Sequence, residues 1–309
     1  MTDGFQPERF FSLFTLDWRE LPNIDVADRV VEAEFFRCDV VPSPVAFKDV
    51  ASMLVIAPHQ DDEVIGAGGT LLLARQAHIS TSIVFVTDGV ITDQETRFSD
   101  DEWIGIRENE AREVCGRLGS EMHQLGISNR SCQATLEHLR RLCDIIAQSK
   151  PDVVLVPWLL DAPPKHRYAN HLLYLAHQLG RLPDFQVWSY QVHNTIHANA
   201  FADVTAVAEG KLDLLRCYRS QNENCRRYDH QAMGLGAWNS RFLPTMFRTM
   251  AEQYVELFYV SSRDEYFELI RHFYLPNLKY TYQGHPAVTE AATAIQAAVH
   301  VALGLGREE

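Results

Sequence analysis

The sequence predicts an α/β fold in which one mostly parallel β-sheet is flanked by helices. Short apolar runs at residues 53–57, 82–86 and 153–156 are typical of strands that are buried on both faces of a parallel sheet. Segments of helical character separate these runs, and such alternation of strand and helix indicates consecutive βαβ units. We therefore expect a single domain of Rossmann-like architecture, with extensions at both ends.

The expected elements follow one another in a regular order along the chain. Strands are expected at residues 52–57, 81–87, 152–157, 187–192 and 254–260. Helices are expected at residues 65–78, 101–118, 133–149, 166–179, 209–218 and 264–273, and a last amphipathic helix in the alanine-rich C-terminal end. Gly119 follows the second of these helices, at a place where glycine commonly ends a helix. A glycine-bearing loop is expected near residues 234–236.

The chain divides into a central domain and two extensions. Residues 1–50 show no clean period and contain four prolines, so we expect an N-terminal extension that packs on the core with short helices and an edge strand. Residues 51–260 hold the alternating pattern and form the expected domain. Residues 261–309 are expected to form a helical C-terminal extension.

Composition narrows the classes of partner. The formal net charge is 28 − 41 = −13 and the sequence pI is about 5.4, which argues against a nucleic-acid partner and against an anionic membrane surface. No run of about eighteen apolar residues is present, so we expect no membrane insertion. The first residues lack the basic and apolar regions of a signal peptide, and the six cysteines form no CxxC pair. These features predict a cytoplasmic protein with reduced thiols; the oligomeric state is not readable.

The most informative segment follows the first expected strand. Residues 58–63 read Pro-His-Gln-Asp-Asp-Glu, and ligands of such sheets gather beyond the carboxyl ends of the strands. Imidazole and carboxylate groups suit zinc, and a spare carboxylate beside a metal can act as a general base. An acidic helix N-terminus is the alternative, and it would explain Asp61 and Glu63 but not His59.

Three glycines, Gly66, Gly68 and Gly69, follow this segment. Glycines at the start of a helix can cradle a phosphate, or they can allow close packing of the helix on a strand. We favour close packing, because no Lys-Ser/Thr pair follows and no GxGxxG pattern is present.

A catalytic zinc usually has three protein ligands, so further ligands are expected at another strand end. The loop after the strand at 152–157 leads to His166 and His171 at the start of a helix. In a parallel sheet this loop lies at the same edge as His59, and either histidine could complete a His/Asp/His site.

Two motifs resemble those of the PIG-L/LmbE-like zinc-dependent N-acetylglucosaminyl deacetylases. Residues 58–63 resemble the family signature Pro-His-Pro-Asp-Asp-Glu and differ only at Gln60. Residues 161–167 resemble the second signature, Asp-x-His-x-Asp-His-Arg, but Pro163 replaces its first histidine and Lys165 replaces its acid. Weaker similarities at Arg-x-x-Glu and Val-Asp-Ile-Ser/Thr segments extend the resemblance over about residues 50–260.

The resemblance implies a metal-dependent hydrolase. It makes His59, Asp62 and His166 the metal ligands and Asp61 the general base, with Glu63 in a supporting role behind them. His171 is the reserve ligand, because a spacing of five residues places it on a rather different helix face from His166. Zinc is the expected cofactor, although such a site also accommodates iron, cobalt or manganese.

Other residues are expected to contact substrate. The resemblance makes Arg107 a substrate-binding residue, with an ion pair to Glu110 or Glu113 as the alternative. Asn129 lies where the family often places an acid that holds sugar hydroxyls.

The resemblance implies that the histidine replaced by Pro163 helps to stabilise the oxyanion. Proline cannot do so, and therefore either another group donates or the rate is low. The candidates are Lys165, His171, His193 and His197. His193 and His197 are preferred because they follow a strand, and a plain surface role remains the alternative for each.

The expected reaction is removal of an N-acetyl group from an N-acetylated amino sugar or a glycoside of one, such as an N-acetylglucosamine derivative. A metal-dependent amidase on a non-sugar amide is one alternative. A degenerate member that binds a sugar or a partner protein without turnover is another, and Pro163 and Lys165 motivate it. The particular sugar, the acyl group and the native metal are not readable from the sequence.

Overall fold

The computed structural model of this chain describes residues 42–91, 98–180, 182–223, 226–276 and 278–305. Eight strands lie in these residues: β1 Ser43–Pro44, β2 Ser52–Ala57, β3 Ser80–Thr87, β4 Glu121–Ile127, β5 Val153–Pro157, β6 Gln186–Tyr190, β7 Ala200–Asp203 and β8 Val255–Ser262. They form one sheet in the order β1-β7-β8-β6-β5-β2-β3-β4. Only β8 is antiparallel to its neighbours, β6 and β7. The predicted mostly parallel α/β sheet is therefore confirmed.

Strand β2 lies at the centre of this sheet, between β3 and β5. Its residues are fully buried from Met53 to Ala57, but they alternate between the two faces. Leu54 and Ile56 pack in the core on one face, whereas Met53 and Val55 pack in the core on the other. A continuous apolar run in the sequence is the consequence of this burial on both sides.

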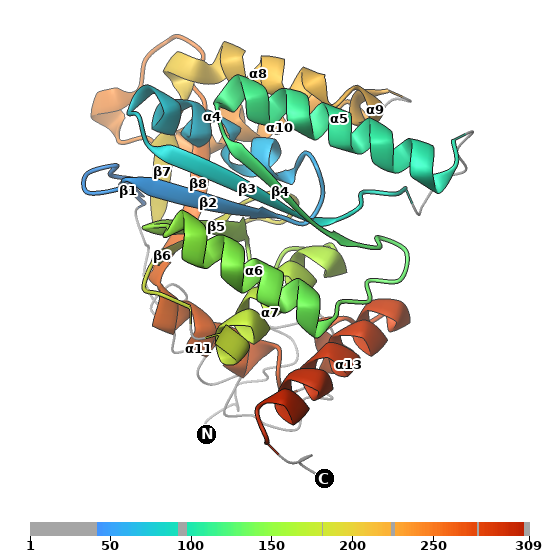
Figure 1. Cartoon of the computed structure of the whole chain (residues 1–309). Helices are drawn as coiled ribbons and strands as arrows, with labels where there is room; N and C mark the ends of the chain where they lie inside the picture. Colours follow the sequence, from blue (N-terminus) through green and yellow to red (C-terminus); the bar gives the residue numbers. More distant parts are fainter. Residues whose placement is uncertain (1–41, 92–97, 181, 224–225, 277, 306–309) are drawn as a thin grey trace, which may run out of the picture.

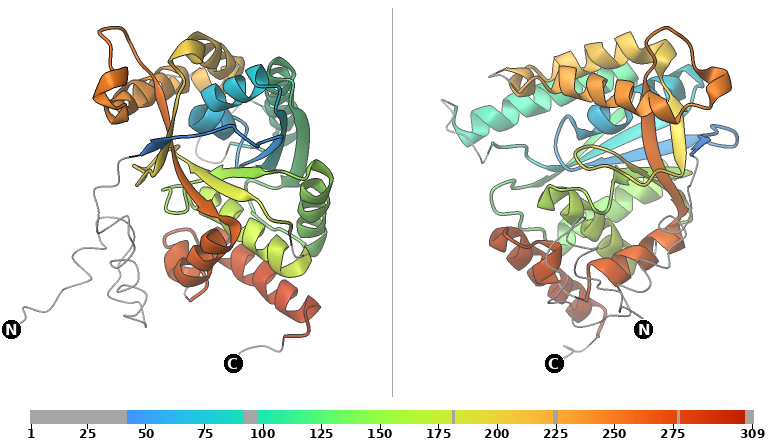
Figure 2. Two further views of the ribbon diagram at one scale, coloured as in Figure 1. Left: turned by 90° about the vertical axis from the view of Figure 1, so that its left-hand side faces the viewer. Right: turned by 180° about the vertical axis from the view of Figure 1, so that it is seen from behind.

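Helices cover both faces of the sheet (Figure 1). One layer holds α4 Asp62–Gln76, α5 Asp100–Leu118, α8 Ala208–Cys217 and α10 Tyr228–Asn239. The other layer holds α6 Leu136–Ser149, α7 Pro164–Gly180, α11 Arg263–Phe273 and α13 Pro286–Ala302. Shorter helices are α9 Arg219–Asn222 and α12 Leu278–Thr281. Figure 2 shows the sheet between the two layers from two further sides.

Local signals fix where several helices begin and end. Ser99 caps α5 and forms a reciprocal capping box with Glu102. Gly119 ends the same helix in a left-handed conformation at φ 72°, as the sequence predicts. None of the helices in the described segments combines the length and the apolar character that crossing a membrane requires.

Besides the short helices α9 and α12, which were not expected, three elements differ clearly from the sequence-based expectation. Strand β4 was not expected, because it pairs only with β3 at the sheet edge and its sequence, Glu-Met-His-Gln-Leu-Gly-Ile, is half polar. Strand β7 was also missed, since four residues carry too little period to recognise. The expected loop at residues 234–236 lies inside helix α10, where packing against β8 outweighs the low helix propensity of glycine.

The two extensions are described only in part. The expected edge strand is present as β1, but residues 1–41 of the N-terminal extension lie outside the described residues. In the expected C-terminal extension, α11 and α13 pack against α7 and belong to the same core as the sheet. The boundaries of the three segments remain a prediction.

The order of the strands creates a crevice at one edge of the sheet. After β2 the chain continues to β3 and β4 on one side, and it then crosses over to β5 and β6 on the other. At such a switch point the loops after the two central strands diverge, and ligands bind between them. Here these are the loops that follow β2 and β5.

Candidate active site

The loop after β2 turns directly into α4 and brings His59 beside Asp62. The backbone amide of His59 donates to Asp62 Oδ2 at 2.9 Å, and Asp62 belongs to the first turn of α4.

The glycines of this helix allow its close approach to the sheet. A Cβ added at Gly66 would lie 2.1 Å from Tyr190 Cδ2, and one at Gly69 would lie 2.6 Å from Val204 Cβ. The expectation that these glycines serve close packing is confirmed.

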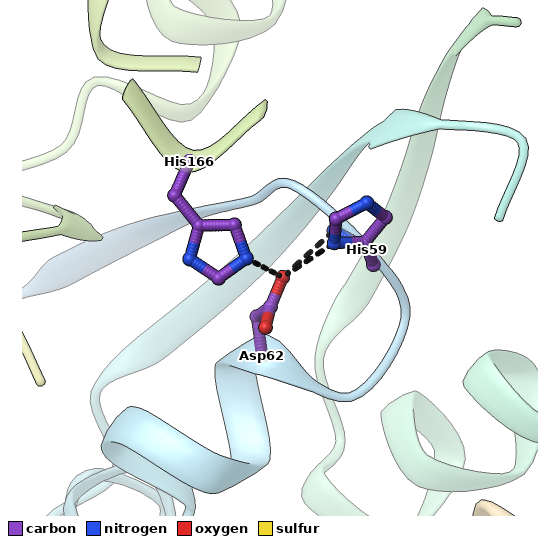
Figure 3. Close-up of side chains that lie close together, drawn as sticks. All are labelled: His59, Asp62 and His166. Carbon is purple, nitrogen blue, oxygen red and sulfur yellow. Dashed lines mark hydrogen bonds and ion pairs between the residues drawn. The ribbon is translucent and has the colours of Figure 1, made fainter. Parts of the chain in front are cut away.

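His166, in the first turn of α7 after β5, completes a cluster with these two residues (Figure 3). His59 Nδ1 is 3.2 Å and His166 Nε2 is 3.3 Å from Asp62 Oδ2. Four donors around a tetrahedral zinc at about 2.1 Å would lie roughly 3.4 Å apart. Within the described segments this is the only group of three ligand-type residues whose donor atoms converge, all within 4.8 Å. The donor set therefore fits a divalent ion.

His166 is held from behind by Asp161. Its Nδ1 is 2.8 Å from Asp161 Oδ2, so a proton on Nδ1 leaves the lone pair of Nε2 directed at the cluster. Asp161 is fully buried and also accepts from the backbone amides of Ala162, His193 and Asn194. These hydrogen bonds link the loop after β5 to the loop after β6.

Asn129 holds His59 in an equivalent way. The Asn129 side-chain amide donates to the carbonyl of Val90 at 2.7 Å, which leaves its oxygen to face His59 Nε2 at 3.1 Å. His59 Nε2 then carries the proton, and the lone pair of Nδ1 is available to a metal.

The charges of the cluster depend on one another. Burial opposes the charge on Asp62, but His166 and His59 together hold the pKa of its carboxyl well below the usual range. Burial likewise opposes the charge on His166, yet the carboxylates of Asp62 and Asp161 raise the pKa of this histidine to about 10, so a metal that binds Nε2 would displace its proton. Burying a charged side chain without a partner is costly, and in this cluster the opposite charges of the three side chains offset that cost.

Asp61 lies beside the cluster in a strained backbone conformation. Its φ is 144°, a value that non-glycine residues rarely adopt. The carboxylate of Glu63 accepts from the Asp61 amide at 3.0 Å, and the Tyr218 hydroxyl donates to the other oxygen of Glu63. Burial, which Arg107 opposes, raises the pKa of Asp61 to about 7. Glu63 thus contacts the backbone that carries Asp61, and its supporting role remains a prediction.

Arg107 forms the ion pair with Glu110 that the sequence offered as an alternative, and it also lines the cleft; its contact with substrate remains a prediction. It is 2% exposed, pairs with Glu110 at 3.4 Å and also donates to Ser220. Its guanidinium donates to the carbonyl of Gln60 and lies 3.6 Å from Asp61 Oδ2, on the wall of the cleft. It therefore holds the loop that carries Asp61, and it is no surface ion pair.

The cluster lies in a cleft of about 430 Å³. The residues expected to contact substrate, Arg107, Asn129 and His193, all line it. Of the four groups considered as replacements for the missing histidine, Lys165 and His193 line the cleft, whereas His171 and His197 do not. The ring of His193 lies 5.3 Å from that of His166 between centroids.

The structure does not support a role for His171 as reserve ligand. Its Nδ1 is 3.1 Å from the Tyr282 hydroxyl, in the buried seam between α7 and the C-terminal helices. Five residues along a helix rotate a side chain by about 140° from its starting direction. His171 consequently points away from His166 and the cleft.

Several cleft residues gave no sequence signal. They are Ile65, Val90, Ile91, Trp103, Arg226, Tyr228 and His285. Most come from segments that no motif covers, and only the fold brings them to the ends of β2 and β5. Asp161 is different: it begins the second motif, and that position is the signal that could have indicated its role.

Fold and cluster together define a Rossmann-like α/β protein with a candidate divalent-metal site at its switch point. Residues 54–177 match the PIG-L family, described as GlcNAc-PI de-N-acetylase. This match covers both motifs, and the resemblance predicted from them is confirmed.

Individual relatives agree with this assignment. The diacetylchitobiose deacetylase of Thermococcus kodakarensis is 29% identical over 191 residues, which are 57% of this chain and 72% of that protein. Among solved structures, the N,N'-diacetylchitobiose deacetylase of Pyrococcus horikoshii has a TM-score of 0.60 at 23% identity, covering 78% of this chain and 94% of its own. GalB, the 4-carboxy-2-hydroxymuconate hydratase of Pseudomonas putida, has a TM-score of 0.59 at 21% identity, covering 68% and 95%. The same fold thus carries different reactions, and the site must decide the function.

Proposed function

We propose that this protein is a zinc-dependent N-deacetylase that removes the acetyl group from an N-acetylated amino sugar or a glycoside of one. The observation that carries the proposal is the convergence of His59, Asp62 and His166, with Asp61 beside them as an additional carboxylate in the same cleft. The deacetylase names of its sequence relative and of the matching family support the proposed reaction.

The proposed metal ligands and Asp61 have different roles in this reaction. Zinc held by His59, Asp62 and His166 would polarise the amide carbonyl and make water more acidic. Asp61 accepts a proton from the attacking water, whose oxygen forms the new bond to the acetyl carbon. The carbon–nitrogen bond then breaks, and Asp61 returns the proton to the departing nitrogen. Acetate and a free amine result.

The remaining cleft residues orient these groups. Arg107 and Glu63 hold Asp61 in its strained conformation through the Gln60 carbonyl and the Asp61 amide. His193 is the proposed donor to the oxyanion in place of the histidine that Pro163 removes, because it lines the cleft next to His166. Asn129 acts through His59, since both ends of its amide are already bonded.

Acetate release tests this proposal. N-acetylglucosamine and N,N'-diacetylchitobiose would be incubated with wild type and with Asp61→Asn, and bound metal would be measured in both proteins. We expect kcat to fall by about 10²–10⁴-fold in the variant while it retains its metal, as for the loss of a general base. Asp144→Asn, an exposed acid on α6, is the matched control and should behave like wild type.

Other outcomes separate the alternatives. Bound metal without acetate release from any sugar would point to an amidase for a non-sugar amide. Sugar binding without metal in wild type would point to a binding protein. Full activity in Asp61→Asn would remove Asp61 from the mechanism.

A further inference from the structure

Basic side chains outnumber acidic ones in the lining of the cleft. Among the described residues that line it, the only acids are Asp61 and Asp62, which the proposed reaction uses. Apart from the phenol of Tyr228, every other ionisable side chain there is basic: His59, Arg107, Lys165, His166, His193, Arg226 and His285. The whole chain carries a formal charge of −13, so this basic lining is a local property of the cleft.

Lys165 and His285 form one wall of this cleft. Lys165 lies in the first turn of α7, next to His166, and His285 immediately precedes α13. Burial and the positive charges of Arg167 and Lys165 lower the pKa of His285. Lys165 therefore lines the same cleft as both the proposed metal ligands and the C-terminal segment.

Arg167 adds a further cation behind this wall. Its guanidinium donates to the backbone carbonyls of Asp161 and Ala162, and in the described part of the chain it forms no ion pair with a carboxylate. Its Nε is buried without a hydrogen-bond partner. Positive charges gathered along the cleft raise the local potential and attract anions into it.

The sequence of this wall departs from the resembling family at the same place. Lys165 occupies the position where the second motif has an acid, so the charge at the cleft is reversed. His285 comes from a segment beyond residues 54–177, which match the family. The wall thus lies partly outside the segment that matches the family, whereas the metal cluster lies within it.

We propose that the substrate carries an anionic group, a carboxylate or a phosphate, which binds between Lys165 and His285. The inference rests on the proposed function, because the acetamido group is placed at Asp61 and the metal cluster. The anionic substituent then extends along the wall formed by the starts of α7 and α13.

The test compares matched sugars. kcat/KM would be measured for N-acetylglucosamine, its 1-phosphate, its 6-phosphate and N-acetylmuramate, which carries a carboxylate. A charge-assisted contact corresponds to about a tenfold or greater preference, so we expect wild type to prefer at least one anionic sugar by that factor. The phosphates and N-acetylmuramate distinguish the two kinds of anion.

Variants of the wall locate the preference. Lys165→Met should reduce the ratio of anionic to neutral kcat/KM by about tenfold, and His285→Gln should reduce it less, because its charge is partial. Lys150→Met is the matched control: it removes the same charge from an exposed residue at the other end of β5 and should keep the wild-type ratio. Equal loss on neutral and anionic sugars in Lys165→Met would overturn the proposal and indicate a role at the oxyanion. A wild type without preference would overturn it as well.

A binding measurement separates this inference from the deacetylase proposal. Glucosamine, its 1-phosphate, its 6-phosphate and muramate would be titrated calorimetrically into wild type and Lys165→Met, which requires no turnover. Selective binding of at least one of the three anions that is lost in the variant supports the anion site even if no sugar releases acetate. Equal affinity for all four ligands in wild type contradicts the anion site even if deacetylation is observed.

Discussion

Each histidine of the site is oriented by a hydrogen bond to a second side chain. Asp161 holds His166, and Asn129 holds His59. The sequence predicted both histidines, because they follow strands and lie in recognisable motifs. It could not predict the role of Asn129, since the contact with His59 spans 70 positions and depends on how β2 and β4 lie in the sheet.

Removing the charge of Asp161 should weaken the hold on His166. Asp161→Asn keeps the shape of the side chain but loses the carboxylate that pairs with Nδ1, so we expect metal affinity to fall by about 10–100-fold. Competition with a chelating dye measures this affinity directly. Asp144→Asn on the exposed face of α6 serves as control, and thermal melting would show whether the variant is folded. Unchanged affinity in a folded variant would show that Asp161 only links the two loops.

Among the secondary-structure elements, the sequence predicted the strands that are buried on both faces and missed strands at an edge or of short length. Strands β2 and β5 are buried on both faces, and their apolar runs predicted them nearly to the residue. Strands β4 and β7 were missed, because an edge position or a short length leaves a weak pattern. The start of α4 was predicted three residues late, since its first turn consists of the site residues Asp62 and Glu63.

The glycines of α4 give a prediction about packing. Gly66→Ala would place a Cβ 2.1 Å from the ring of Tyr190, whose hydroxyl is fixed on the carbonyl of Ile56. We expect a loss of about 1–3 kcal/mol in the free energy of unfolding, as for other overpacked sites. Gly105→Ala in α5 is the matched control: no neighbour lies within 4 Å, so it should stabilise the protein by about 0.5–1 kcal/mol. Urea unfolding measures both, and two variants of equal stability would show that α4 shifts freely.

Across the whole molecule, the cleft depends on contacts between distant parts of the chain. The switch point between β2 and β5 brings His59 and His166 together across 107 positions (166 − 59) of sequence. The C-terminal segment then adds His285 to the cleft and packs α13 on α7. Motifs predicted the cluster, but the far wall of the cleft follows only from this packing, which no local pattern encodes.

The seam between α7 and the C-terminal segment should make the stability of the whole fold sensitive to acid. His171 is fully buried there, stacked on Tyr282, and burial, which Gln296 opposes, lowers its pKa to about 4. In the unfolded chain a histidine titrates near pH 6.5. Between about pH 6.5 and pH 4 the unfolded state thus binds the additional proton, and stability falls as the pH falls through this window. One proton over this range corresponds to about 3 kcal/mol.

Substitution of this histidine should remove that part of the pH dependence. His171→Gln abolishes the titration, so we expect it to cost stability at pH 7, where the contact with Tyr282 is lost, and progressively less toward pH 4. The free energy of unfolding would be measured by urea denaturation at half-unit steps of pH. His230→Gln, an exposed histidine on α10, should keep the wild-type slope. If the curves of wild type and His171→Gln stay parallel from pH 7 to pH 4, His171 takes up its proton equally in the folded and unfolded states and the seam is not the acid-sensitive element.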